Sequence, residues 1–318
     1  MSVMSETMEC PVCPHHCRLK PGQVGICRTR TLQDGKIVSL TYGEVAAWHL
    51  DPIEKKPLYH FYPGSWIFSV GAYGCNLKCF FCQNHEISQT VAKGYEVTPE
   101  QLAELSVRNN SIGICFTYSE PLMWYEMILD TAPLVKKRGG KVVLVSNGII
   151  AQDYLEKLIP FLDAANIDIK AFSDDFYKKH TKGRLKWVLD TVEKLVGRVH
   201  TEVTTLVIPT LNDDPEQIKE LAEWLAALPA PIAWHLSRYF PRYKSAIPAT
   251  DPTKLQSLAE IAQSYLPYVY LGNVAGKNNT YCPQCGLEVI TRGWKVGMQT
   301  KEGKCLRCGR QIWGIGLN

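Results

Sequence analysis

The sequence predicts an α/β fold built on a parallel sheet, and three observations lead to that prediction. Short apolar or β-branched runs recur between residues 66 and 271, and helical patterns separate them. Strands that alternate with helices in this way pair in parallel through right-handed crossovers. Eleven of the twelve cysteines fall into three groups, two of which lie outside the alternation, near the chain ends. We therefore expect a central sheet with small cysteine-rich, metal-binding segments at both ends.

Length and composition limit the class of protein. A chain of 318 residues with 46% hydrophobic and 21% charged residues is typical of a globular protein that buries a large core. A net charge of +4 is too small to indicate nucleic-acid binding by itself. No apolar run approaches the roughly 18 residues that a membrane span needs, and residues 1–10 lack a signal-peptide core. We expect a soluble, cytoplasmic protein whose close thiol pairs bind metal, without a membrane partner.

The predicted elements follow in order along the chain. Asp34-Gly35 predicts a hairpin turn, and strands are expected at 66–70, 113–117, 141–145, 164–169, 202–208, 232–236 and 268–271. Thr98-Pro99-Glu100-Gln101 is a capping box that opens a helix, and Asp214 and Asp251 open two more. Gly139-Gly140 ends a helix that runs from Pro121. We expect three domains or segments, at 1–60, 61–274 and 275–318. The alternation of strands and helices alone allows a barrel or a doubly wound sheet. In either fold, reactive groups are expected at the carboxyl ends of the strands.

A group of three cysteines follows the first predicted core strand directly. Cys75, Cys79 and Cys82 have the spacing C-x3-C-x2-C. Three thiolates from one loop can hold three corners of a 4Fe-4S cube and leave the fourth iron open to a small ligand with amino and carboxylate groups. The alternatives are a zinc knuckle completed by His85 and a purely structural cluster.

This loop, with aromatic Phe81 before its last cysteine, resembles the motif of the radical S-adenosylmethionine (SAM) superfamily. The resemblance implies a partial (β/α)6 TIM-type barrel with Cys75, Cys79 and Cys82 as catalytic cluster ligands and Phe81 beside the cofactor. It also implies that the cluster passes one electron to SAM, which splits into methionine and a 5′-deoxyadenosyl radical. That radical then abstracts hydrogen from a substrate.

Further positions match the superfamily's cofactor-binding sites at successive strand ends. Tyr118-Ser119-Glu120-Pro121 stands where relatives have Gly-Gly-Glu-Pro, with both glycines replaced. Glu120 can accept a bond from the cofactor's ammonium and Ser119 offers a hydroxyl, although the same residues suit a simple helix entry. The remaining cofactor candidates are Asn147, Asp168, Lys170, Thr204 and His235.

Alternatives stay open for several of these residues. Asp168 and Lys170 share one face of a strand, so they could form a structural ion pair. Only one of Thr204 and Thr205 can point inward. His235 could equally be a hydrogen-bonded core residue.

The flanking cysteines form two groups of four. Cys282-x2-Cys285 and Cys305-x2-Cys308 have zinc-ribbon spacing, which would also suit a rubredoxin-like iron. Cys10, Cys13, Cys17 and Cys27 could bind structural zinc, which we favour slightly, or an auxiliary iron-sulfur cluster that relays electrons. The lone Cys115 lies in an apolar strand and is expected to pack.

Longer stretches resemble the radical SAM enzyme of the AmmeMemoRadiSam system, a branch close to pyruvate formate-lyase activating enzymes. They are Cys-Pro-His-His-Cys at 13–17, Leu-Tyr-His-Phe-Tyr-Pro-Gly at 58–64, Asn-Ile-Asp-Ile-Lys-Ala-Phe at 166–172, Glu-Val-Thr-Thr-Leu-Val-Ile-Pro at 202–209 and Trp-His-Leu-Ser-Arg-Tyr-Phe-Pro at 234–241. The resemblance implies Memo-like and Ammecr-like partner proteins and a low-potential electron donor. It does not identify the substrate.

Four functions follow as hypotheses. The first is a radical enzyme that acts on a small molecule or nucleotide, with Tyr118, Arg238 and Arg242 near the substrate; the arginines could instead belong to a solvated basic loop. The second is an activase that acts on a glycine of another protein. Zinc-dependent nucleic-acid binding through the basic stretch 177–186 is possible but not favoured. Electron transfer alone is the fourth.

Overall fold

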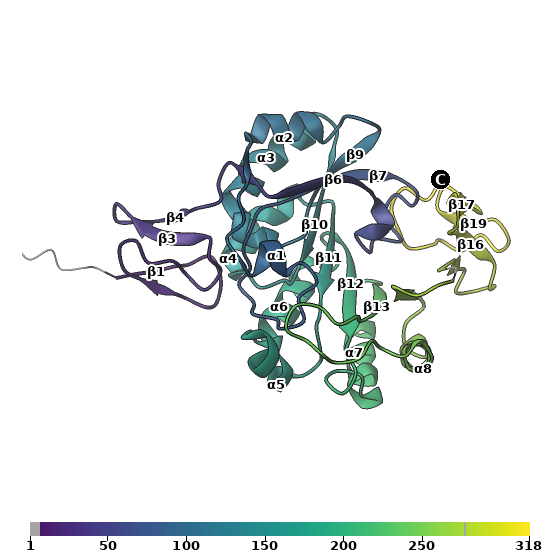
Figure 1. Ribbon diagram of the computed structural model, residues 1–318. Helices are drawn as coiled ribbons and strands as arrows, with labels where there is room; N and C mark the ends of the chain where they lie inside the picture. The colour runs from purple at the N-terminus through teal and green to yellow at the C-terminus, as the bar shows by residue number, and fades with distance from the viewer. Residues whose placement is uncertain (1–6, 277) are drawn as a thin grey trace, which may run out of the picture.

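A computed structural model describes residues 7–276 and 278–318. Its centre is an eight-stranded sheet that forms a partial barrel, in the order β14-β13-β12-β11-β10-β9-β7-β6 (Figure 1). Neighbouring strands from β7 to β14 pair in parallel. They are β7 (Trp66–Gly71), β9 (Ser111–Phe116), β10 (Lys141–Ser146), β11 (Ala164–Asp168), β12 (His200–Val207), β13 (Ala233–Arg238) and β14 (Val269–Gly272). The predicted α/β fold is confirmed.

The sheet contains a strand that the alternation does not predict. β6 (Ala47–Pro52) pairs antiparallel with β7 over its whole length. It lies before residue 61, so the predicted segment 1–60 contributes an edge to the central sheet. Three consecutive residues, Trp48, His49 and Leu50, are exposed, and this pattern lacks the alternation that marks a half-buried strand.

Helices connect the strands, and their start signals act as predicted. The Thr98 side chain accepts from the Gln101 amide and completes a capping box on α2 (Pro99–Leu105). Asp214 caps α7 (Pro215–Ala226) and Asp251 caps α8 (Pro252–Gln263). The remaining helical segments are α1 (His85–Ser88), α3 (Tyr125–Lys137), α4 (Gln152–Leu158), α5 (Asp174–Phe176), α6 (Leu185–Leu195), the 3₁₀ turns η1 (Ile53–Lys55), η2 (Pro121–Trp124) and η3 (Ile159–Phe161), and the π turn η4 (Tyr177–Thr181). None of the helices in the described residues combines the length and apolarity that a bilayer crossing requires.

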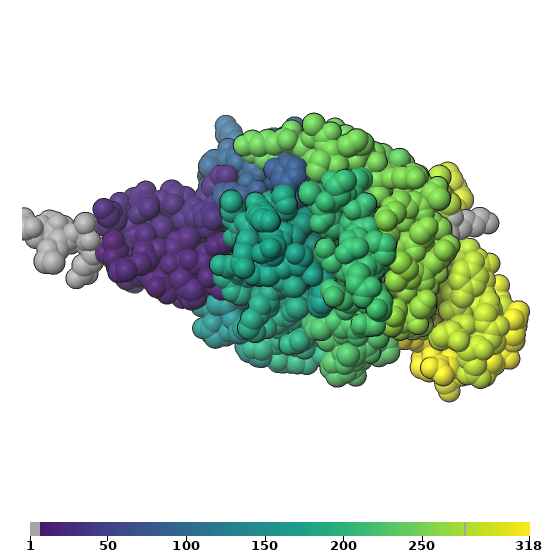
Figure 2. Space-filling model, turned by 90° about the horizontal axis from the view of Figure 1, so that it is seen from below, coloured from purple at the N-terminus to yellow at the C-terminus, as the bar shows by residue number. Residues whose placement is uncertain are grey.

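Small cysteine-containing sheets occupy opposite ends of the molecule (Figures 1 and 2). At the N-terminal end, β1 (Met8–Glu9) pairs with β2 (Arg18–Leu19), and β3 (Arg30–Gln33) pairs with β4 (Lys36–Ser39) through the predicted turn at Asp34-Gly35. The C-terminal end contains β15 (Thr280–Tyr281), β16 (Glu288–Thr291), β17 (Gly297–Met298), β18 (Thr300–Lys301) and β19 (Lys304–Cys305). A short pair, β5 (Glu44–Val45) with β8 (Tyr95–Glu96), lies beside the sheet edge.

Residues 57–60, which we call the plug, fill the barrel interior beneath the strand ends. The Glu202 carboxylate on β12 accepts bonds from the backbone amides of Tyr59, at 3.0 Å, and His60, at 2.8 Å. The Asn166 amide on β11 donates to the Pro57 carbonyl at 2.8 Å. Buried Glu202 thus has four donors, because His200 and His235 also bond to it. The plug is therefore fixed to the strands by polar contacts.

Candidate active site

A cavity of about 350 Å³ opens at the carboxyl ends of the parallel strands. This is the end of an α/β sheet at which ligands bind, and the volume lies within the range of small-molecule sites. Pro57 of the plug lies in its wall. The predicted residues that line it are Cys75, Cys79, Phe81, Cys82, Tyr118, Ser119, Glu120, Asn147, Asp168, Lys170 and Thr204.

The three central cysteines share this cavity because the loop after β7 folds back over the strand ends. The Leu77 amide donates to Cys75 Sγ at 3.3 Å, and Cys82 Sγ lies 3.0 Å from Ser88 Oγ on α1. Burial raises the pKa of Cys75 well above its usual range and that of Cys79 to about 12. Thiols in such surroundings ionise only when a cation compensates the charge, as a metal centre does.

Glu120 is 2% exposed and carries several hydrogen bonds at the start of η2. Its Oε1 accepts from Ser146 Oγ at 2.6 Å and from the Leu122 amide at 3.0 Å, and its Oε2 accepts from the Asn147 amide at 2.8 Å. Burial nevertheless raises the pKa of Glu120 to about 7. Oε2 retains an acceptor position, so a cationic group in the cavity would have a buried carboxylate to bind.

Asp168 and Lys170 leave β11 on the same side of the cavity. Lys170 Nζ lies 2.7 Å from Asp168 Oδ2, which is the ion pair that their spacing allows. Asp168 Oδ1 is buried and has no partner among the described residues. A buried carboxylate oxygen without a donor is costly unless a ligand supplies one.

Asn147 and Thr204 complete the polar wall on neighbouring strands. The Asn147 amide donates to Asn76 Oδ1 at 2.9 Å and lies 3.6 Å from Cys75 Sγ. Thr204 donates to Asn166 Oδ1 at 2.9 Å and faces the cavity. Thr205 faces the other way, where it donates to the Ile169 carbonyl.

Three predicted residues lie outside the cavity wall. His235 points into the barrel beside the plug, where its Nε2 lies 2.7 Å from Glu202 Oε2 and its ring packs against Tyr59. Arg238 donates to the Thr250 carbonyl and stacks on Phe240. Arg242 is exposed on the loop beyond β13.

Several residues that line the cavity were not predicted from the sequence. Ser88, Ser237 and Asn273 add polar groups to the wall. Of these only Ser237 carried a signal, because it is two residues from His235 on the same strand and shares its face. Tyr118 also has an unpredicted partner: its hydroxyl donates to Asp51 Oδ2 on β6 at 2.7 Å.

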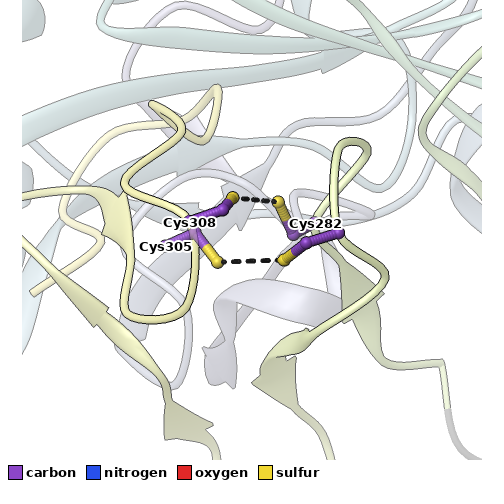
Figure 3. A group of neighbouring side chains, drawn as sticks. Cys282, Cys305 and Cys308 are labelled. Carbon is purple, nitrogen blue, oxygen red and sulfur yellow. Dashed lines mark hydrogen bonds between the residues drawn. The ribbon is translucent and has the colours of Figure 1, made fainter.

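The C-terminal cysteines form a compact group that could hold a metal ion. The sulfurs of Cys282, Cys285, Cys305 and Cys308 all lie within 4.8 Å of one another. Cys282 and Cys308 point toward each other with sulfurs 3.6 Å apart, as do Cys285 and Cys305 (Figure 3). Four thiolates bound to one tetrahedral ion at about 2.3 Å would have nearly this separation.

The N-terminal cysteines also gather in one place. Cys10, Cys13 and Cys27 are buried, and Cys17 is partly exposed. The Cys10 amide donates to the Cys17 carbonyl at 2.9 Å. In contrast to these groups, Cys115 is buried within β9 and does not reach the cavity.

Comparisons with known proteins agree with this geometry. The profile of the Radical SAM superfamily matches residues 70–225, which contain the three-cysteine loop, Glu120 and Asp168. The chain is 38% identical to Uncharacterized protein MJ0808 of Methanocaldococcus jannaschii, over 96% of this chain and 95% of that one. It is 31% identical to the pyruvate formate-lyase-activating enzyme of Clostridium pasteurianum, over 47% of this chain and 65% of that enzyme.

A solved structure shows the same fold. Streptococcus suis SuiB bound to S-adenosylmethionine superposes with a TM-score of 0.54 at 14% identity, over 70% of this chain and 53% of SuiB. The identity is low, so the similarity concerns the barrel only. The superfamily profile and the relationship to an activating enzyme lead to one assignment: residues 70–225 of the chain belong to the radical SAM superfamily, and related members of that superfamily are enzymes.

Proposed function

We propose that the chain reductively cleaves S-adenosylmethionine and uses the resulting 5′-deoxyadenosyl radical to abstract hydrogen from a substrate. The observation that carries the proposal is the presence of three thiols, a buried carboxylate and an unpartnered carboxylate oxygen in one cavity. The family implies a 4Fe-4S cluster and S-adenosylmethionine. The cluster supplies one low-potential electron and an open iron for the cofactor's amino and carboxylate groups.

The residues of the cavity fit these groups. Cys75, Cys79 and Cys82 would hold three irons, and iron would compensate the charge of thiolates that burial otherwise disfavours. Glu120 would accept the cofactor's ammonium at its free acceptor position. Asp168 Oδ1 would accept a ribose hydroxyl and thereby gain the partner that it lacks. Lys170 would stay on Asp168 Oδ2 and hold that carboxylate in place.

A small molecule or nucleotide is the first candidate substrate. The cavity of about 350 Å³ has room for little beyond the cofactor, so a substrate would meet the cofactor at the edge of the cavity. An activase that acts on a protein glycine is the second candidate, because of the similarity to the activating enzyme of Clostridium pasteurianum.

The partner proteins of the AmmeMemoRadiSam system remain a proposal. The stretches at 13–17 and 58–64 that support it lie outside the matched profile. Co-purification with a Memo-like and an Ammecr-like protein would test it.

The test of the chemistry is formation of 5′-deoxyadenosine after anaerobic reconstitution with iron and sulfide and reduction with dithionite. We expect product from the wild type and from Cys115→Ala, a control that removes a buried thiol outside the cavity. Cys79→Ala should form none. Equal product from Cys79→Ala and the wild type would refute the proposal.

The substrate class is tested with deuterium-labelled cell extract, separated by size before it is added. Transfer of deuterium into 5′-deoxyadenosine from the low-molecular-weight fraction supports a small substrate. Transfer only from the protein fraction supports the activase.

A further inference from the structure

The N-terminal cysteines lie directly against the loop that carries the central cysteines. The Cys75 amide donates to the Cys27 carbonyl at 3.2 Å, so one hydrogen bond joins a residue of each group. Next to it, Lys78 Nζ donates to the Ile26 carbonyl at 2.6 Å. A Cβ on Gly74 would lie 2.3 Å from Thr29 Cγ2 and 2.6 Å from the Cys27 carbonyl oxygen. The two loops approach so closely that only glycine fits between them.

Two cysteines of the N-terminal group, Cys17 and Cys27, direct their sulfurs to a common space. Gly25 lies between them, because a Cβ there would be 3.7 Å from Cys17 Sγ and 3.8 Å from Cys27 Sγ. Thr29 Oγ1 donates to Cys27 Sγ at 3.2 Å. Sulfurs that converge on one space and accept hydrogen bonds are typical of iron-sulfur sites.

The contact with the central loop separates this group from the C-terminal one. The sulfurs of the C-terminal cysteines lie within 4.8 Å of one another, which suits one tetrahedral ion. That group has no residue in the wall of the cavity that contains the central cysteines. The N-terminal group instead shares a backbone hydrogen bond with Cys75, so it is the group placed to exchange electrons with the central cysteines.

We infer that Cys10, Cys13, Cys17 and Cys27 bind an iron-sulfur cluster that passes electrons to the central cluster through the Cys27–Cys75 contact. The inference rests on the proposed function, which provides the acceptor. A low-potential one-electron carrier of the ferredoxin or flavodoxin class reduces the N-terminal cluster by one electron. That cluster is reoxidised as the central cluster gains the same electron, and no bond forms or breaks.

The first test counts metal and acid-labile sulfide in the anaerobically reconstituted full chain. Two cubes predict about eight sulfides, whatever ion the C-terminal site holds, and about eight irons with zinc or nine with iron at that site. About four sulfides together with zinc at the N-terminal cysteines would overturn the inference. Since this measurement uses the wild type, it does not depend on the folding of a variant.

Two variants locate the second cluster. Cys10→Ala/Cys13→Ala should lose half of the sulfide, whereas Cys282→Ala/Cys285→Ala should keep all of it, because neither zinc nor a rubredoxin-like iron contains sulfide. Full sulfide in the first variant would contradict the assignment.

The isosteric change Thr29→Val provides a spectroscopic check in a folded protein. It removes the hydroxyl that donates to Cys27 Sγ, and such a hydrogen bond stabilises the more negative, reduced state of a cluster. One of the two electron paramagnetic resonance signals should therefore titrate with a lower reduction potential. The matched control is Thr31→Val, two residues further along the chain in β3, since Thr31 donates to the Gln23 carbonyl. Identical potentials in wild type, variant and control would count against a cluster at Cys27.

The relay is tested with two reductants. In Cys10→Ala/Cys13→Ala, 5′-deoxyadenosine formation driven by reduced flavodoxin should fall at least tenfold, while formation driven by dithionite should persist. An unchanged flavodoxin-driven rate would overturn the relay and leave the proposed function intact. Failure of both reductants with wild type that contains eight sulfides would instead overturn the proposed function.

Discussion

Tyr118 holds a backbone conformation that glycine adopts more easily, with φ of +72°. Its side chain contacts two charged residues, Asp51 and Lys56. Its hydroxyl donates to Asp51 Oδ2, and Lys56 Nζ donates to the same oxygen at 2.8 Å. Lys56 also lies 4.6 Å from the centre of the tyrosine ring. These contacts tie the loop that carries Glu120 to β6, and they replace the freedom that two glycines give the corresponding loop in relatives.

Removing the Tyr118 hydroxyl should therefore destabilise the protein. Tyr118→Phe takes one donor from the buried Asp51 carboxylate, and we expect the free energy of unfolding to fall by about 1–2 kcal/mol. Urea denaturation followed by circular dichroism measures the change. Tyr42→Phe is the control, because the exposed Tyr42 hydroxyl donates to Asp130 at the surface. An equal loss in both variants would contradict this role of Tyr118.

Asp51 gives the stability a defined dependence on pH. Burial opposes ionisation, but hydrogen bonds from Lys56 and Tyr118 prevail and lower its pKa from 3.8 to about 2. A lowered carboxyl pKa contributes stability that is complete above about pH 4 and is lost as the pH falls toward 2. Asp51→Asn, which leaves buried Lys56 without its anion, should be less stable than wild type by about 3 kcal/mol at pH 7. The difference should shrink between pH 5 and 2; a constant difference in denaturation curves would refute the assignment.

Site residues could be predicted from the sequence where a motif spacing or a strand end determines their position. The three-cysteine spacing and the acidic and amide residues at successive strand ends led to the side chains that line the cavity. His235 shows the limit of that reasoning. Strand alternation correctly predicts that its side chain points inward. It does not reach the cavity because the plug lies between them, and the plug is held by contacts with residues more than a hundred positions away in the sequence.

Elements that depend on distant pairing were the ones that the sequence did not predict. The parallel strands and the capped helices carry local patterns, so their positions follow from the sequence. β6 is defined by its ladder with β7, and its exposed apolar residues do not alternate. A strand whose register is set by its neighbour leaves little local signal.

One buried cation contributes to the attachment of the N-terminal hairpins to the barrel. Arg30 on β3 is 1% exposed, donates to both carboxylate oxygens of Glu126 on α3, and also donates to the Met123 carbonyl at 3.1 Å. Glu126→Gln leaves the guanidinium without its anion, and the partial exposure of Glu126 reduces the cost to about 1–3 kcal/mol. Hydrogen exchange should accelerate in residues 18–39, while β10 and β11 stay protected. Unchanged exchange in the hairpins would show that other contacts hold them.

At the scale of the whole molecule, the C-terminal strands brace the plug. Arg292 donates to the Tyr59 carbonyl at 2.6 Å, and His60 Nδ1 lies 2.7 Å from the Trp313 carbonyl oxygen. The Tyr62 amide donates to the Ile315 carbonyl at 2.7 Å. The compact cysteine group holds the segments that make these contacts in place.

Removal of a metal ion bound by the C-terminal cysteines should therefore increase exchange inside the barrel. With Cys305→Ser/Cys308→Ser, or after treatment of the wild type with a chelator, we expect at least tenfold faster hydrogen exchange in residues 280–317 and a smaller increase in residues 57–62. Acid-labile sulfide should not change in the double variant. Faster exchange at the C-terminal strands with full protection of the plug would disprove the coupling.

Because a connector rather than a strand fills the barrel's interior, part of the cavity wall is formed by Pro57, between β6 and β7. A cavity floored by strand side chains would deepen only through coordinated changes on several strands. Here a smaller residue at Pro57 would admit a larger molecule and leave the cysteine loop unchanged. A single position on the connector can thus alter the size of molecule that the cavity accepts without altering the three cysteines.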